Sequence, residues 1–163
     1  MRWVNGSEIK IEDFTGEELC EKLASDMHGG CEQYLDCADF IRTAAFLIEF
    51  DTELAMQGIF SFLENSIGHY APHIVRSFRA IGDDRDADVL EEICRLAMPD
   101  VMRGEFLNKA NGAYQITSFA SNHKIQEETE EKITELAAGL YLYNDFDIWP
   151  LLFRYLDEQI KKQ

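Results

Sequence analysis

Two histidines four residues apart could together bind a metal ion for hydrolysis. On a continuous helix His69 and His73 would share one face, as two imidazole ligands of one metal ion must. Pro72 lies between them and is typical of the first turn of a helix, so we expect His69 in the turn before that helix. This break favours surface or capping histidines over a metal-assisted hydrolase that uses both residues with nearby carboxylates.

Ser66 is a candidate nucleophile because it lies close to His69 in the sequence. Neither an elbow pattern nor an oxyanion feature accompanies it. Its neighbours Asn65 and Gly68 can adopt a positive φ, which favours a turn over catalysis here. The chain also contains no Gly-x-x-x-x-Gly-Lys loop, Gly-x-Gly-x-x-Gly loop or His-Glu-x-x-His motif. We therefore predict that the protein is not an enzyme and needs no cofactor.

The four cysteines, Cys20, Cys31, Cys37 and Cys94, include no Cys-x-x-Cys pair. His28, Cys31 and Cys37 are near one another, but their spacing matches no common zinc pattern, so incidental or buried cysteines are favoured over zinc. The N-terminus has no apolar signal segment, and the longest apolar run is far short of the roughly 20 residues of a membrane span. We expect free thiols and a cytoplasmic location.

The composition is strongly acidic. Thirty-one acidic residues oppose 15 basic ones, which gives a net charge of −16. Nucleic acid and anionic membranes are unsuitable direct ligands, because both attract Lys and Arg. A basic protein is the favoured partner, since opposite charge accelerates encounter at low salt. The alternative is that the charge only maintains solubility.

Acidic side chains recur every four residues along three predicted helices. Like charges at this spacing cost a helix a few tenths of a kcal/mol per pair. Pairing of Glu18 with Lys22 and of Glu128 with Lys132 would relieve some of this cost. The sequence allows a solvated helix face, but we predict a partner-binding surface that consists of Glu17, Glu21, Asp84, Asp88, Glu92, Glu127, Glu131 and Glu135.

A single acidic column of this kind is too sparse to imitate DNA. It presents one charge per about 6 Å of helix. Duplex DNA presents one charge per about 1.7 Å of its axis. Three or four columns would have to share a face, on several helices or across a dimer.

Helical periodicity dominates the segments that carry these columns. Thr15 and Glu18 form a predicted capping box, followed by apolar residues at four-residue spacing. The segment 59–63 is short enough to be a strand or a helical turn, and we favour a helix. Further helices are predicted over residues 36–50, with an extension to Gly58 if Asp51 and Thr52 do not interrupt it, and over 72–81, 84–98, 126–143 and 147–160.

Residues 100–124 are the least periodic part of the chain. Asn111-Gly112 favours a tight turn, which is compatible with a small hairpin around residues 106–118. No repeat, low-complexity segment or long linker divides the chain, and its 46% hydrophobic content is sufficient for a sizeable core. We predict a single acidic domain over residues 1–163, all-α and bundle-like, with six or seven helices.

A set of residues between positions 53 and 98 adds a resemblance to a known family. The set comprises Glu53, Gly58-Ile59-Phe60-Ser61-Phe62, Asn65-Ser66-Ile67-Gly68 and Ala80-Ile81-Gly82. It resembles the bacterial DNA-mimic protein family, an acidic helical domain, and the segment 141–145 is similar in character. Met56 and Gln57 depart from the usual Asn and Gly, and Ile59 replaces Phe.

The resemblance implies an all-helical domain and a homodimer whose acidic face occupies the DNA-binding surface of a DNA-binding protein such as a transcription factor. It also implies backbone roles for Gly58, Asn65, Gly68 and Gly82, and packing roles for Phe60 and Phe62. An immunity or inhibitor protein for a basic toxin or nuclease would use the same electrostatics. It remains the main alternative, and the metal-assisted hydrolase is the second.

Overall fold

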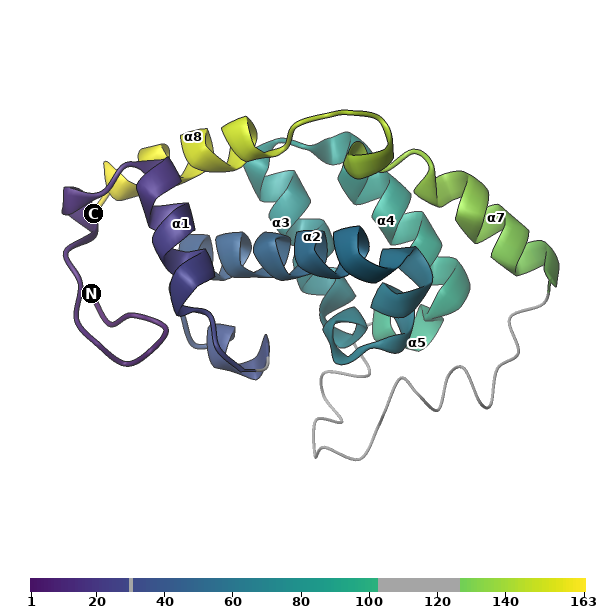
Figure 1. Ribbon diagram of the computed structural model, residues 1–163, viewed down its shortest axis with the longest axis horizontal. Coiled ribbons are helices and arrows are strands. Elements are labelled where there is room, and N and C mark those ends of the chain that lie inside the picture. The colour runs from purple at the N-terminus through teal and green to yellow at the C-terminus, as the bar shows by residue number, and fades with distance from the viewer. Residues whose placement is uncertain (30, 103–126) are drawn as a thin grey trace.

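The computed structural model describes residues 1–29, 31–102 and 127–163 (Figure 1). Within these ranges it contains seven α-helices and no strand, so the predicted all-α fold is confirmed. The hairpin predicted at 106–118 lies outside the described residues. The α-helices are α1 (Gly16–Asp26), α2 (Asp39–Glu64), α3 (Ala71–Ile81), α4 (Asp84–Ala97), α5 (Pro99–Met102), α7 (Glu127–Ala137) and α8 (Trp149–Ile160). Short 3-10 helices join them at η1 (Ile11–Asp13), η2 (Cys31–Tyr34), η3 (Ser66–Tyr70) and η5 (Tyr141–Tyr143).

Helix α2 is the central element of the fold. It lies along the long axis of the molecule, with α1 crossing it near one end and α7 beyond the other end (Figure 1). Most of its apolar side chains are buried, and Phe46, Phe50 and Phe62 are fully buried. They join buried side chains of the surrounding helices in one hydrophobic cluster. None of the helices in the described ranges is both long and apolar enough to cross a membrane.

Gly58 bends α2 and lets the ambiguous segment 59–63 continue as helix. Its φ of 80° and ψ of −177° are non-helical and are adopted almost only by glycine. A hydrogen-bond network bridges the bend: the Ser61 hydroxyl donates to the Glu53 carboxylate at 2.8 Å, and the Asn65 amide donates to the same carboxylate. Gly58, Ser61 and Asn65, which carry the family resemblance, therefore form and stabilise the kink near the C-terminal end of α2.

Gly58→Ala is expected to destabilise the protein by about 1–3 kcal/mol, because alanine must adopt this strained backbone conformation. The nearest side-chain atom to an added Cβ would be the Tyr143 Oη, at 3.9 Å, so the cost comes from the backbone and not from a clash. Urea unfolding measures it. Met56→Ala is the matched control, since Met56 is 74% exposed and its truncation should change stability by less than about 0.5 kcal/mol. Equal stabilities of the two variants would contradict this account of the bend.

The turns around α3 agree only in part with the predicted backbone roles. Gly82 directly follows α3 and ends it, as predicted, and its φ of 86° is left-handed. The positive φ suggested for Asn65 and Gly68 is wrong: Asn65 is extended, with a φ of −85°, and Gly68 is not among the positive-φ residues. Asn65 acts instead through its side chain, which holds Glu53 and the Ser61 hydroxyl.

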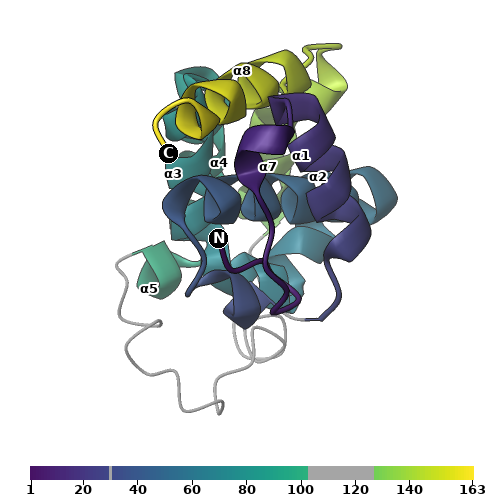
Figure 2. The same ribbon diagram turned by 90° about the vertical axis from the view of Figure 1, so that its left-hand side faces the viewer.

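The N-terminal end of α1 packs against α8, as the front of Figure 2 shows. The predicted capping box is present: the Thr15 hydroxyl accepts from the Glu18 N–H, and the Glu18 carboxylate accepts from the Thr15 N–H. This bonding lowers the pKa of Glu18. The predicted Glu18–Lys22 pair is wrong, because Lys22 instead contacts the Asp26 carboxylate at 2.8 Å.

The last two helices differ from their predicted bounds at one end each. Helix α7 ends at Ala137 and not near Tyr143, because residues 138–140 form a turn that leads into η5. Helix α8 begins at Trp149, and its first backbone N–H donates to the Asp147 carboxylate at 3.0 Å. Asp147 thus caps the helix from two positions away, and Pro150 lies in the first turn as predicted.

Candidate functional site

Helix α4 presents the first predicted acidic column on its outer face. Asp83 caps the helix by accepting from the Asp86 N–H at 3.2 Å, which starts the helix directly before Asp84. The side chains of Asp84 and Asp88 are 77% and 69% exposed. Glu92, one turn further, is half-buried. The column therefore faces solvent mainly at the start of α4.

Arg79 of α3 partly neutralises the α4 column. Its guanidinium lies 2.8 Å from carboxylate oxygens of both Asp88 and Glu91, and 3.6 Å from Asp84. Arg95 also contacts Glu91, at 2.9 Å. The repulsion expected along the helix is thus relieved by a cation from the preceding helix, which the spacing within α4 could not indicate.

Helix α7 carries the second column, and its acidic groups are less compensated. Glu127, Glu131 and Glu135 are all exposed, and so are Glu128 and Glu130. Within the described residues, no Lys, Arg or His nitrogen lies within 4 Å of any of these five carboxylates, so the predicted Glu128–Lys132 pair is not formed. Ile133 and Ala137 are buried on the opposite side of the helix.

The structure brings the α4 and α7 columns onto neighbouring helices but separates the α1 pair from them. Helices α4 and α7 pack side by side at one end of the long axis (Figure 1). Glu17 and Glu21 are exposed on α1, which lies near the opposite end. In Figure 2, α1 and α8 face the viewer and α7 lies behind them. The eight predicted residues therefore form two separate acidic regions.

Tyr141 fixes α7 to the rest of the fold. Its hydroxyl donates to Asp51 of α2 at 2.6 Å, and its backbone N–H donates to Asp86 of α4 at 2.7 Å. The Asn144 amide, which follows η5, donates to the carbonyl oxygens of Ala138 and Leu140 and closes the turn after α7. The segment noted for its resemblance at 141–145 thus positions the acidic helix.

Two carboxyl groups are buried behind the acidic surface. Asp86 is fully buried and Asp83 is 5% exposed, and one oxygen of each has no hydrogen-bond partner among the described residues. Burial, together with the neighbouring Asp83, raises the pKa of Asp86 to about 7. Below this pH a proton on Asp86 gives the buried pair a hydrogen-bond donor.

Asp86→Asn is expected to remove a pH dependence of stability. In the unfolded chain the pKa of Asp86 is about 3.9. Because the folded pKa is higher, the stabilising contribution is complete below about pH 4 and is lost as the pH rises through about 7. The asparagine amide can still accept from Tyr141 and donate to Asp83, without titrating.

Urea unfolding between about pH 5 and pH 8 tests this expectation. The variant should gain stability relative to the wild type as the pH rises, by at most roughly 1.4 kcal/mol per pH unit. Parallel stability curves for the two proteins would contradict a raised pKa at Asp86. Asp88→Asn, an exposed change on the same helix, is the control and should leave the pH dependence almost unchanged.

The two histidines lie in different elements, as Pro72 predicted. His69 lies in η3 and His73 in α3. The His73 ring stacks on Phe46 with 5.2 Å between ring centroids, and its Nδ1 lies 2.9 Å from an Arg76 guanidinium nitrogen. Burial, followed by the charges of Arg76 and Arg42, lowers the pKa of His73 to about 4. Across the described ranges, no group of three or more His, Cys, Asp or Glu side chains could hold a metal ion.

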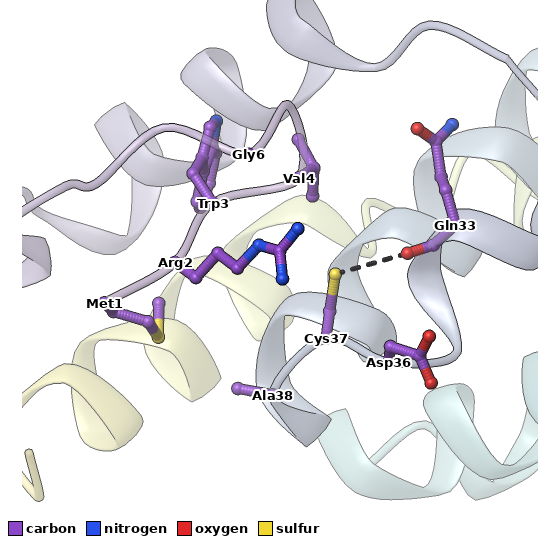
Figure 3. Close-up of a pocket in the computed structure, with 9 residues that line it drawn as sticks. All are labelled: Met1, Arg2, Trp3, Val4, Gly6, Gln33, Asp36, Cys37 and Ala38. Atoms are coloured by element: carbon purple, nitrogen blue, oxygen red, sulfur yellow. Dashed lines mark hydrogen bonds between the residues drawn. The ribbon is translucent and has the colours of Figure 1, made fainter.

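A pocket of about 440 Å³ lies between the N-terminal segment and the start of α2 (Figure 3). Arg2 and Trp3 line it on one side, and Asp36 and Cys37 line it on the other. The Cys37 thiol donates to the Gln33 carbonyl oxygen at 3.6 Å, and burial raises the pKa of this thiol. A protonated thiol is a poor nucleophile, so the pocket provides no basis for cysteine catalysis.

A second depression, missed by the sequence reasoning, lies between α2 and α7. This α2–α7 groove has a volume of about 410 Å³, and none of its lining residues carries a charge. Tyr143 lines it and is 50% exposed. No signal within either segment alone indicates such a groove, because its lining comes from two segments far apart in the sequence. The lining comprises Gln57, Gly58, Ile59, Phe60, Thr134, Ala137, Ala138 and Tyr143.

Comparison with known proteins identifies the family of the chain. A family model described as DMP19-like protein matches residues 36–159, a range that runs from just before α2 almost to the end of α8. No curated protein and no solved structure matches the chain. DMP19 is the DNA-mimic protein family, which is the family that the residues between 53 and 98 resemble. Because the match spans well over half of the sequence, the chain belongs to the DMP19-like protein family.

Proposed function

We propose that the acidic surface of α4 and α7 binds the basic DNA-binding surface of a DNA-binding protein, such as a transcription factor, and so excludes DNA from it. The observation that carries this proposal is the set of five exposed α7 glutamates, without a cationic partner among the described residues, beside the α4 column. Membership of a DNA-mimic family supports the same function. The protein acts in this proposal as a binding protein in the cytoplasm and not as an enzyme.

The charge density of this surface supports imitation of DNA better than a single column does. The five α7 glutamates span eight helical steps, a rise of about 12 Å, which gives about one charge per 3 Å. Asp84 and Asp88 add exposed carboxylates on the adjacent helix. The α7 glutamates alone are thus denser than one column but sparser than duplex DNA, which presents one charge per about 1.7 Å of its axis. Glu17 and Glu21 are too distant to contribute, and their role in binding stays a prediction.

Affinity capture from a lysate of the source organism tests the proposal. At low salt the wild-type protein should retain basic DNA-binding proteins, and moderate salt should elute them. A variant with Glu127, Glu131 and Glu135 changed to lysine should retain far less of them. Capture of a basic nuclease or toxin instead would favour the immunity-protein alternative. Equal capture by the variant would exclude the α7 surface.

Arg79→Gln is expected to strengthen partner binding, because it frees the carboxylates of Asp84, Asp88 and Glu91 for the partner. We expect an increase in affinity of about two- to tenfold at low salt. Stability should change little, since the Asp84 and Asp88 carboxylates in these ion pairs are exposed. Arg154→Gln on α8 removes the same charge at an exposed position far from α7 and is the control. An unchanged affinity of the Arg79 variant would mean that the partner does not contact the α4 carboxylates.

A further inference from the structure

We propose that the α2–α7 groove receives an apolar side chain from an amphipathic, basic segment of the protein partner. The inference rests on the proposed function and extends it from charge imitation to a specific anchoring pocket. The groove offers about 410 Å³ between Phe60 of α2 and Thr134 of α7, with an uncharged lining. That volume is large enough to receive a large aliphatic or aromatic side chain of a partner.

The border of the groove is acidic, and this determines the chemistry of its occupant. Thr134 lines the groove, and Glu130 and Glu131 precede it by one helical turn on the same side of α7. Glu64 lies one turn beyond Phe60 on α2 and is exposed. Lys132, in contrast, lies on a different side of α7 from Thr134. An apolar floor with carboxylates around it fits a segment that carries an apolar residue flanked by Lys or Arg.

The same charges disfavour a second copy of this chain as the occupant. A symmetric dimer through the groove would bring the two sets of α7 glutamates together, and like charges across an interface cost several kcal/mol. Duplex DNA is also excluded as the occupant, because it has no apolar side chain that the groove could bury. A partner anchored here would therefore bind more tightly, and with a weaker salt dependence, than phosphate imitation alone allows.

Two synthetic helical peptides of about 20 residues and equal positive charge test the inference. One carries leucines at i and i+4 among lysines, and the other carries glutamine in place of leucine. Isothermal titration calorimetry at about 0.15 M salt measures both. The leucine peptide should bind the wild-type protein at least about tenfold more tightly, because a buried leucine side chain supplies that difference.

Ala138→Trp fills the groove from an exposed position and should abolish the advantage of the leucine peptide. Thr134→Trp is a second filling variant, also exposed, in case the first disturbs folding. Ala24→Trp on α1 is the control and should leave the advantage intact. Circular dichroism verifies that each variant is folded.

Three outcomes would overturn the inference. Equal affinity of the two peptides for the wild-type protein would overturn it and leave the proposed function intact. Retention of the leucine advantage in both filling variants would place the apolar contact elsewhere. Dissociation of a dimer by Ala138→Trp, seen by sedimentation, would assign the groove to a second copy. Failure of both peptides to bind would instead contradict the proposed function itself.

Discussion

Changing Glu127, Glu131 and Glu135 together to lysine is expected to weaken partner binding by at least about 100-fold at low salt, because juxtaposed like charges cost several kcal/mol. The three side chains are exposed, and none has a cationic partner within 4 Å in the described structure. Their replacement should therefore leave the fold almost unchanged, with stability altered by less than about 1 kcal/mol. Isothermal titration calorimetry with the captured partner, at several salt concentrations, measures the change.

The control for this variant changes the net charge equally at the other end of the molecule. Glu12, Asp13 and Glu158 are exposed, lie in η1 and α8, and can be changed to lysine together. This control should lose only the small long-range part of the affinity, and salt should suppress that part. If the two variants bind equally, net charge and not the α7 surface determines the affinity. The glutamine variant at the α7 positions should give an intermediate loss.

Gly16→Ala is expected to destabilise the protein by about 3 kcal/mol, at the upper end of what overpacking costs. A Cβ at this position would lie 2.1 Å from the Phe153 carbonyl oxygen and 3.0 Å from the Asp157 backbone nitrogen. Both contacts are with backbone, so no side-chain rotation can relieve them. The α1 and α8 helices must separate, which also weakens the bond from the Gly16 N–H to the Asp157 carboxylate, 2.6 Å long.

Thermal unfolding measures this effect as a decrease in Tm of about 6–12 °C for a domain of this size. Glu17→Ala is the matched control in the same turn of α1, because Glu17 is exposed and its truncation costs about 1 kcal/mol or less. A Gly16→Ala variant as stable as this control would mean that α1 and α8 do not cross as closely as described. Partner binding at α7 should be unaffected wherever the variant is folded.

The helices could be predicted where the sequence carries both a periodic apolar stripe and a defined end. The capping box at Thr15 and Glu18 starts α1, Pro72 lies in the first turn of α3, and Gly82 ends α3. Each of these signals depends only on residues close to one another in the sequence, so it can be recognised without knowledge of the fold. The same is true of the acidic columns, since four-residue spacing alone places their members on one side of a helix.

Features that depend on contacts between distant elements could not be predicted in this way. Gly16 is an ordinary first-turn residue in the sequence, and only the backbone of α8 makes it indispensable. Arg79 belongs to α3, so the spacing within α4 could not reveal that it neutralises Asp84 and Asp88. The extension of α7 to Tyr143 was wrong because Tyr141 leaves the helix to bond with α2 and α4.

The candidate site was predicted residue by residue but not as a surface. Spacing identified the acids of α1, α4 and α7 equally, yet only the last two helices are neighbours. The α2–α7 groove consists of residues from two segments more than 70 positions apart, such as Gly58 and Ala138. No pattern within either segment describes the space between them. Charge is readable from sequence, whereas shape depends on packing.

Competition with duplex DNA tests the central claim most directly. The captured DNA-binding protein is bound to a fluorescently labelled duplex, and the acidic protein is added while fluorescence anisotropy is recorded. We predict that the wild-type protein releases the duplex completely at saturation, and that the variant with lysine at Glu127, Glu131 and Glu135 does not. A ternary complex in which the duplex stays bound, or equal release by the variant, would contradict the claim.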